Sequence, residues 1–246
     1  MLQDIDAFIF DLGGTLINYE GFPIYWGGYY DEAFKAVSYK LNLNLSEKHI
    51  KTSTEILKNY NPRINPREFE YNPRLVFSDV IKEWDHSTVM IDDVIESFFQ
   101  YFQRNVCVFP DTVEVLEYLK DNHYKVGVLT DMPTGMPTEL IIRDITTIKD
   151  MIDLFLSSVD CGFRKPNKKG LEIIANSFGV NLKNIVYIGD EEKDIKTAKN
   201  AGAVSILINR EKKTISYGED IQINSLSEIK WLLYRGLGDN SVINRE

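Results

Sequence analysis

Three short apolar stretches of the sequence each lead into a polar residue that could act on a ligand. These residues are Asp11, Thr130 and Asp190. In an open parallel sheet the carboxyl ends of the strands meet at one edge, and ligands bind there. We therefore expect the three residues to converge at one site, although more than 170 positions separate the first from the last.

The carboxylates in this group predict a metal site built from oxygen atoms. Asp194 lies four residues after Asp190, so the first turn of a helix can bring it back beside the same site. Two or three carboxylates with backbone carbonyls suit Mg²⁺, and such a cluster is electrostatically costly without a cation. Lys165 adds positive charge from a loop, while Gly13 and Gly14 allow a tight turn that approaches a ligand closely. A hard metal, a lysine, a hydroxyl and a glycine-rich turn together predict a phosphate site.

The elements that must position these residues alternate between strands and helices. Strands are expected at 7–10, 125–129, 154–158, 184–188, 204–208 and 221–223, with helices at 111–121, 138–151, 171–178, 193–202 and 227–233. Asp111 is expected to cap the first of these helices. The alternation predicts an α/β fold with a doubly wound parallel sheet.

Residues 17–108 interrupt this alternation with amphipathic segments and carry no sign of a strand. We therefore divide the chain into an α/β core at 1–17 and 109–234, an inserted α-helical cap at 18–108, and a polar C-terminal tail at 235–246 that is expected to fray. An aromatic group between Tyr19 and Tyr30 opens the cap. It could line a substrate pocket, although packing of the cap against the core is the simpler interpretation.

The bulk composition excludes several classes of function. The chain has 246 residues and a net charge of −9, without a basic stripe, which argues against nucleic acid or an anionic membrane as a partner. No apolar run approaches the roughly 20 residues of a membrane span. The first residues lack the pattern of a signal peptide, and Cys107 and Cys161 have no metal-ligand spacing. A reducing, cytoplasmic location is expected.

Four stretches, in this order, resemble the hydrolases of the haloacid dehalogenase (HAD) superfamily: FIFDLGGTL, KVGVLTD, GFRKP and IVYIGDEEKDIKTAKNAG. The last stretch carries the most specific pattern. The resemblance is to the branch in which a helical cap follows the first strand of a Rossmann-like core, and it covers the chain up to about Leu233. It implies a Mg²⁺-dependent phosphatase that acts on a small phosphorylated metabolite.

The resemblance also implies a role for each site residue. Asp11 would be the nucleophile that forms an aspartyl-phosphate, Thr130 would bind the transferring phosphoryl group, and Lys165 would offset its charge. The implied metal ligands are Asp11, the backbone carbonyl of Gly13, Asp190 and, in a supporting position, Asp194. The implied phosphate-binding residues are Gly14, Thr130, Asp131 and Lys165.

The sequence departs from the family pattern at Gly13. Related phosphatases carry there a second aspartate that protonates the leaving group, and general acid–base help of this kind contributes about 10²–10⁴-fold to the rate. Its loss falls mainly on alkyl phosphates, whose leaving alkoxide is very basic, and less on aryl or acyl phosphates. Asp131 and Glu191 are near enough in the expected fold to replace it.

Three functions therefore stay open. The first is the phosphomonoester hydrolase already described. The second is a catalytically weak binding or regulatory protein of the same fold, for which Gly13 is the support. The third is a dehalogenase, or a phosphonatase that would use a cap lysine such as Lys35 or Lys40. The sequence leaves the substrate and the oligomeric state undetermined.

Overall fold

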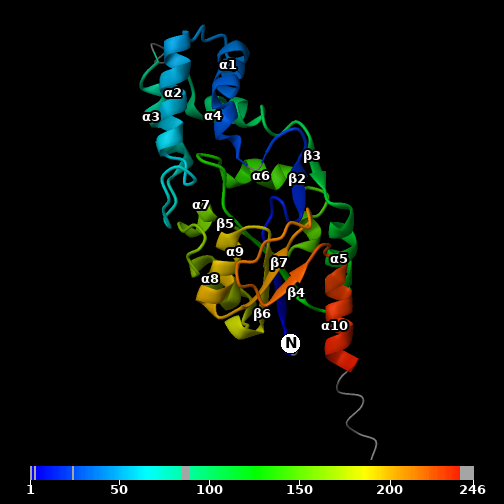
Figure 1. Cartoon of the computed structure of the whole chain (residues 1–246). Helices are drawn as coiled ribbons and strands as arrows, with labels where there is room; N and C mark the ends of the chain where they lie inside the picture. The colour runs from blue at the N-terminus through cyan, green and yellow to red at the C-terminus, as the bar shows by residue number, and fades with distance from the viewer. Residues whose placement is uncertain (1, 3, 24, 85–88, 239–246) are drawn as a thin grey trace, which may run out of the picture.

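The computed structural model describes residues 2, 4–23, 25–84 and 89–238, and its centre is a parallel sheet of six strands (Figure 1). The strand order is β5-β4-β1-β6-β7-β8. The strands are β1 (Ala7–Phe10), β4 (Lys125–Thr130), β5 (Leu154–Ser157), β6 (Ile185–Gly189), β7 (Val204–Ile208) and β8 (Ile221–Ile223). The chain runs outward from β1 through β4 to β5 and then returns to the other side of β1 as β6. This reversal is a topological switch point, and the predicted α/β fold is confirmed.

Helices cover both faces of the sheet because the central strand is apolar on both faces. The helices on one side are α8 (Lys169–Phe178) and α9 (Glu192–Ala201), and those on the other are α5 (Pro110–Asp121) and α10 (Glu228–Gly238) (Figure 1). In β1, Ala7 and Ile9 belong to the apolar cluster beneath α8 and α9, whereas Phe8 and Phe10 belong to the cluster beneath α5 and α10. All four side chains are fully buried, as expected for an interior parallel strand.

Four helices form a separate group beyond one end of the sheet (Figure 1). They are α1 (Tyr30–Lys40), α2 (Glu47–Asn59), α3 (Pro73–Ile81) and α4 (Ile91–Phe99). Three phenylalanine rings meet in its interior: the ring centroid of Phe98 lies 4.8 Å from that of Phe34 and 5.4 Å from that of Phe77. Ser46 caps α2 by accepting a hydrogen bond from the backbone N–H of His49.

The expectation that residues 17–108 contain no strand is wrong. Ile17–Tyr19 forms β2 and Val106–Val108 forms β3, and the two pair antiparallel with Ile17 opposite Val108. This ribbon carries the chain from the sheet to the four helices and back (Figure 1). Strands of three residues are too short to show an alternating pattern, and their partners lie about 90 positions apart in the sequence.

Three smaller expectations also differ from the structure. Asp111 does not cap α5, because Phe109 holds that position and the Asp111 carboxylate instead accepts hydrogen bonds from Arg210, Ser225 and the backbone N–H of Leu226. The helix expected at 138–151 is divided. Residues 235–238, expected in the tail, continue α10, and 239–246 lie outside the described residues. The remaining short elements are α6 (Thr138–Asp144), α7 (Ser158–Cys161), η1 (Trp26–Tyr29), η2 (Lys149–Met151) and η3 (Leu182–Asn184).

Membrane-spanning helices are not found in the described part of the chain, where every helix is too short or too polar to cross a bilayer.

Candidate active site

The carboxyl ends of three adjacent strands bring the predicted site residues together. Asp11 follows β1, Thr130 ends β4 and Asp190 follows β6. The backbone N–H of Asp11 donates to the carbonyl of Ile188 at 2.8 Å, which extends the pairing of β1 and β6 by one residue at this edge. The predicted convergence on one sheet edge is therefore confirmed.

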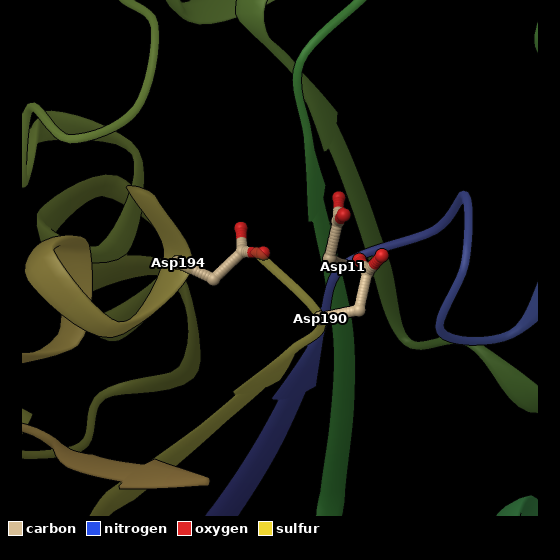
Figure 2. A group of neighbouring side chains, drawn as sticks. All are labelled: Asp11, Asp190 and Asp194. Carbon is tan, nitrogen blue, oxygen red and sulfur yellow. The ribbon is translucent and has the colours of Figure 1, made fainter. Parts of the chain in front are cut away.

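A carboxylate from α9 completes a cluster of three acidic residues. Figure 2 shows Asp194 reaching from α9 toward Asp11 and Asp190. Each of the three offers one carboxylate oxygen, and these atoms all lie within 4.8 Å of one another. Asp194 also accepts a hydrogen bond from the backbone N–H of Glu191 at 2.9 Å, so the same side chain stabilises the start of α9.

Two glycines make this close packing possible. A Cβ on Gly189 would stand 2.3 Å from Cγ of Asp194, so a larger residue would push the carboxylate out of the cluster. Gly14 has a φ of +79°, a conformation that glycine adopts without strain. Its α-carbon faces Asp190 in the same way. Glycine is therefore needed on both sides of the cluster.

Lys165 is the cation at the centre of these carboxylates. Its Nζ lies 2.7 Å from Oδ1 of Asp11 and donates to Oδ1 of Asp194 at 2.6 Å. The side chain is 2% exposed. Burial alone lowers the pKa of Lys165, but the charges of Asp11 and Asp194 outweigh burial and hold this pKa well above its usual value. Lys165 therefore stays protonated at neutral pH.

The acidic cluster carries more negative charge than Lys165 offsets, as expected of a metal site. Oδ1 of Asp190 is buried and, within the described part of the chain, has no hydrogen-bond partner. Burial, and then the charges of Asp11 and Asp194, raise the pKa of Asp190 well above its usual range. Burial also raises the pKa of Asp194, to about 6. Three carboxylates with one lysine thus lack positive charge, and an all-oxygen donor set of this kind fits Mg²⁺.

A second set of ion pairs adjoins the cluster. Lys193 lies 3.3 Å from Asp131 and 2.9 Å from Glu191, and Arg63 pairs with Glu191 at 2.6 Å. Burial raises the pKa of Asp131, but Lys193, Arg164 and Lys165 outweigh it and lower that pKa to about 2. Burial also raises the pKa of Glu191, but the charges of Lys193 and Arg63 outweigh burial and lower that pKa to about 2. Both carboxylates are ionised at neutral pH. Neither therefore has a proton to donate in place of the aspartate that related phosphatases carry at position 13.

A cavity of about 140 Å³ opens above the acidic cluster. Asp11, Gly13, Gly14, Thr130 and Asp131 are among the residues that line it. Other lining residues come from β2 and the chain after it, the loop after α2, and α4 and α6, and many of these residues are aromatic. Gly13 is exposed to this cavity, and among the described residues no atom lies within 4 Å of the position that its Cβ would take.

Several residues at the site went unnoticed in the sequence. The hydroxyl of Tyr187 donates to the carbonyl of Leu129 at 2.9 Å and lies 3.3 Å from Oδ1 of Asp194. In the sequence Tyr187 resembles any other residue of a buried strand. Its polar hydroxyl within an apolar run is nevertheless a sign that it has a hydrogen-bond partner. The roles of Gly189 and Lys193 depend on contacts across the sheet edge. The sequence pattern does not show these contacts.

The chain matches the model of a known protein family. Residues 5–202 match the model of haloacid dehalogenase-like hydrolases, and the chain belongs to this family. The resemblance found in the sequence is thereby confirmed for the family.

Curated relatives match over part of their length. A glyceraldehyde 3-phosphate phosphatase of Methanocaldococcus jannaschii is 34% identical over 125 residues, which cover 49% of this chain and 54% of that protein. A phosphoglycolate phosphatase of Yersinia pestis is 24% identical over 126 residues, which cover 50% and 53%. The chain thus spans about half the length of these relatives.

Solved structures match over nearly the whole chain. A HAD phosphatase from Thermococcus onnurineus has a TM-score of 0.65 at 21% identity and covers 93% of this chain and 98% of its own. A 2-haloacid dehalogenase from Pseudomonas syringae has a TM-score of 0.70 at 22% identity and covers 94% and 99%. At this level of identity the similarity shows the fold, which phosphatases and dehalogenases share.

Proposed function

We propose that this chain is a Mg²⁺-dependent phosphomonoester hydrolase that acts on a small phosphorylated metabolite in the cytoplasm. One observation carries the proposal: Asp11 lies at the switch point of the sheet, within ion-pair distance of Lys165 and in one oxygen cluster with Asp190 and Asp194. The phosphatases among the relatives support the same reaction.

Asp11 is the nucleophile in this proposal. A carboxylate oxygen of Asp11 forms a bond to phosphorus while the bond from phosphorus to the leaving oxygen breaks, which gives an aspartyl-phosphate. Water then hydrolyses this intermediate and regenerates Asp11. Thr130 binds the phosphoryl group through its hydroxyl, with help from Gly14 and Asp131. Oδ1 of Asp131 accepts a hydrogen bond of 3.0 Å from the backbone N–H of Lys165 and so orients the loop that carries this lysine.

Lys165 holds the nucleophile in place and offsets negative charge throughout. Because its pKa lies well above the usual value, it stays charged when a phosphoryl group arrives. Asp11, Asp190 and the carbonyl of Gly13 would hold Mg²⁺, with Asp194 in support, and the ion would supply the positive charge that a phosphoryl dianion needs. Residues 18–108 would act as the cap that closes over the site, excludes water and selects the substrate.

A weakly active or regulatory protein is the second candidate, and Gly13 favours it. Position 13 has no side chain to protonate a leaving group, and the neighbouring carboxylates of Asp131 and Glu191 are ionised. Such a protein would keep affinity for Mg²⁺ and phosphate but turn over very slowly.

Cleavage of a carbon–halogen or carbon–phosphorus bond has less support. Dehalogenation needs no metal. The acidic cluster counts against it, because Oδ1 of Asp190 is buried and no partner for it lies among the residues that the structure describes. The candidate lysines for a phosphonatase lie elsewhere on the four-helix group: Lys35 is 3.9 Å from Glu47, and Lys40 donates to Gln100. Neither lysine lines the cavity.

Phosphate release from a panel of phosphomonoesters, with Mg²⁺ and with EDTA, tests the proposal. The expected result is turnover that needs Mg²⁺ and that Asp11→Asn abolishes. Asp150→Asn, a change of the same kind at an exposed position of η2, is the matched control and should leave turnover unchanged. Activity that persists in Asp11→Asn would contradict the assignment of the nucleophile, and a lack of turnover on the whole panel would contradict the reaction.

A further inference from the structure

The cavity above Asp11 has a wall of aromatic rings whose role the proposed reaction does not explain. We call Tyr19, Phe22, Tyr25, Trp26, Tyr30 and Phe99 the aromatic wall; all six line the cavity that also contains Asp11 and Gly13. Five of these residues come from the short stretch 19–30, and Phe99 comes from the end of α4.

Residues of the aromatic wall pack against other aromatic rings. Trp26 stacks on Phe102 with ring centroids 4.5 Å apart, and Tyr19 packs edge-on against Trp26 at 5.0 Å. Two of its hydroxyl groups are already engaged: that of Tyr19 donates to Asp144 at 2.6 Å, and that of Tyr30 accepts from Asn61 at 2.9 Å. Trp26, Tyr30 and Phe99 are almost fully buried, so the ring surface that a ligand can contact comes mainly from Tyr19, Phe22 and Tyr25. A preformed surface of this kind binds with little loss of conformational entropy.

The basic side chains that line the cavity are already paired with carboxylates of the protein. Arg63, Arg164 and Lys193 line the cavity, and each is paired with a carboxylate within the protein. Arg63 pairs with Glu191, Arg164 donates to Glu70, and Lys193 lies 2.9 Å from Glu191. A substrate with its own carboxylate would have to break one of these pairs, whereas an apolar group would leave them intact.

Gly13 independently limits the leaving group. A cleaved phosphomonoester releases its oxygen with the electron pair of the broken bond, and position 13 has no side chain to protonate that oxygen. A phenolate, whose conjugate acid has a pKa near 10, can leave without a proton far more easily than an alkoxide, whose basicity approaches that of hydroxide from water of pKa 15.7. The missing acid is therefore tolerable for an aryl phosphate.

We propose that the aromatic wall binds the leaving group of an aryl phosphate monoester with a single ring. This inference rests on the proposed phosphatase activity and names its substrate class. A cavity of about 150 Å³ can hold one benzene ring, and the cavity here has about 140 Å³. The aryl oxygen would face Gly13 and the ring would lie against the aromatic wall.

Binding and turnover test the inference separately. Phenylphosphonate, which the enzyme cannot hydrolyse by this route, and methylphosphonate are titrated by calorimetry in the presence of Mg²⁺. Phenylphosphonate should bind at least about tenfold more tightly, because only its ring can bury apolar surface on the aromatic wall. Equal affinities would overturn the inference whatever the turnover results are.

Variants of Tyr25 locate the ring. Tyr25 is 37% exposed, so its replacement is expected to leave the fold intact. Tyr25→Ala should weaken phenylphosphonate binding several-fold more than methylphosphonate binding, and Tyr25→Phe, which keeps the ring, should restore it. Tyr39→Ala, at a tyrosine of α1 that is 88% exposed and outside the cavity, is the control and should change neither affinity.

Turnover then separates this inference from the proposed function. The value of kcat/KM for phenyl phosphate should exceed those for cyclohexyl phosphate and 2-phosphoglycolate by about 10²-fold or more, which is the range of missing acid catalysis. If 2-phosphoglycolate is the better substrate and Asp11→Asn abolishes its hydrolysis, the phosphatase proposal stands and the aryl inference fails. If no ester is hydrolysed while phenylphosphonate still binds selectively through Tyr25, the reaction fails and the ring site stands.

Discussion

The carboxylate of Asp190 lies directly against the backbone of Gly14. A Cβ on residue 14 would stand 2.3 Å from Oδ2 of Asp190, which is closer than two non-bonded atoms can approach. The glycine in the turn after β1 and the carboxylate after β6 are therefore coupled. Space at residue 14 determines where the candidate metal ligand can lie.

Gly14→Ala is accordingly expected to lower both stability and Mg²⁺ affinity. The left-handed backbone costs alanine about 1–2 kcal/mol, and the methyl group displaces Asp190. Gly218→Ala is the matched control, because Gly218 has a φ of +81° and, among the described residues, open space around its α-carbon. Urea denaturation should show a loss in both variants, with the larger loss in Gly14→Ala, whereas calorimetric titration with Mg²⁺ should show weaker binding only in Gly14→Ala. Equal Mg²⁺ affinities would contradict the coupling.

Lys165→Met should destabilise the protein strongly in the presence of EDTA. Removing the lysine leaves Asp11 and Asp194 buried without their cation, and breaking a buried ion pair in this way costs about 3–5 kcal/mol. Lys169→Met is the comparison, since Lys169 is 49% exposed and pairs with Glu172 on the surface, where such pairs contribute about 0–1 kcal/mol. Chemical denaturation measures both changes, and similar losses in the two variants would refute a buried charge network.

Asp131 should make stability depend on acid pH. Its folded pKa of about 2 is lower than its usual 3.8, so its ionised form stabilises the fold. This contribution, roughly 2 kcal/mol, is fully present above about pH 4 and is lost as the pH falls through about 2. The difference in unfolding free energy between the wild type and Asp131→Asn should therefore shrink between pH 4 and pH 2. A difference that stays constant across this range would show that Asp131 does not contribute in this way.

The sheet and the strand-end residues were predictable because their signals are local. Each central strand is an uninterrupted apolar run, and a polar residue marks its carboxyl end. Parallel pairing then brings Asp11, Thr130 and Asp190 together without further information. Asp194 follows from helical spacing alone.

The other features depend on contacts between distant segments and could not be predicted in this way. The pairing of β2 with β3 joins two strands of three residues each, too short for a period to appear. The ion pairs of Lys193 with Asp131 and of Arg63 with Glu191 cross from one element to another, so their charges look like ordinary surface charges in the sequence. Their consequence, two carboxylates that stay ionised, was therefore hidden as well.

Gly13→Asp should raise the activity of the protein on alkyl phosphates. Residue 13 lines the cavity, its φ lies outside the left-handed region, and no described atom lies within 4 Å of the Cβ position, so an aspartate can be accommodated without strain. The new carboxyl group supplies the missing general acid, for which an increase in kcat of about 10²-fold or more on cyclohexyl phosphate is expected. The increase on phenyl phosphate should be much smaller, because phenolate leaves without a proton.

Gly28→Asp makes the comparison specific to the site. Gly28 lies in η1, is exposed, and among the described residues also has open space around its α-carbon, but it does not line the cavity. The same substitution there adds the same charge and should leave kcat on both esters unchanged. An equal increase on both esters in Gly13→Asp would argue against a role in protonating the leaving group. No increase, together with negligible activity of the wild type, would favour the binding or regulatory protein, because a restored acid cannot accelerate a reaction that the remaining residues do not carry out.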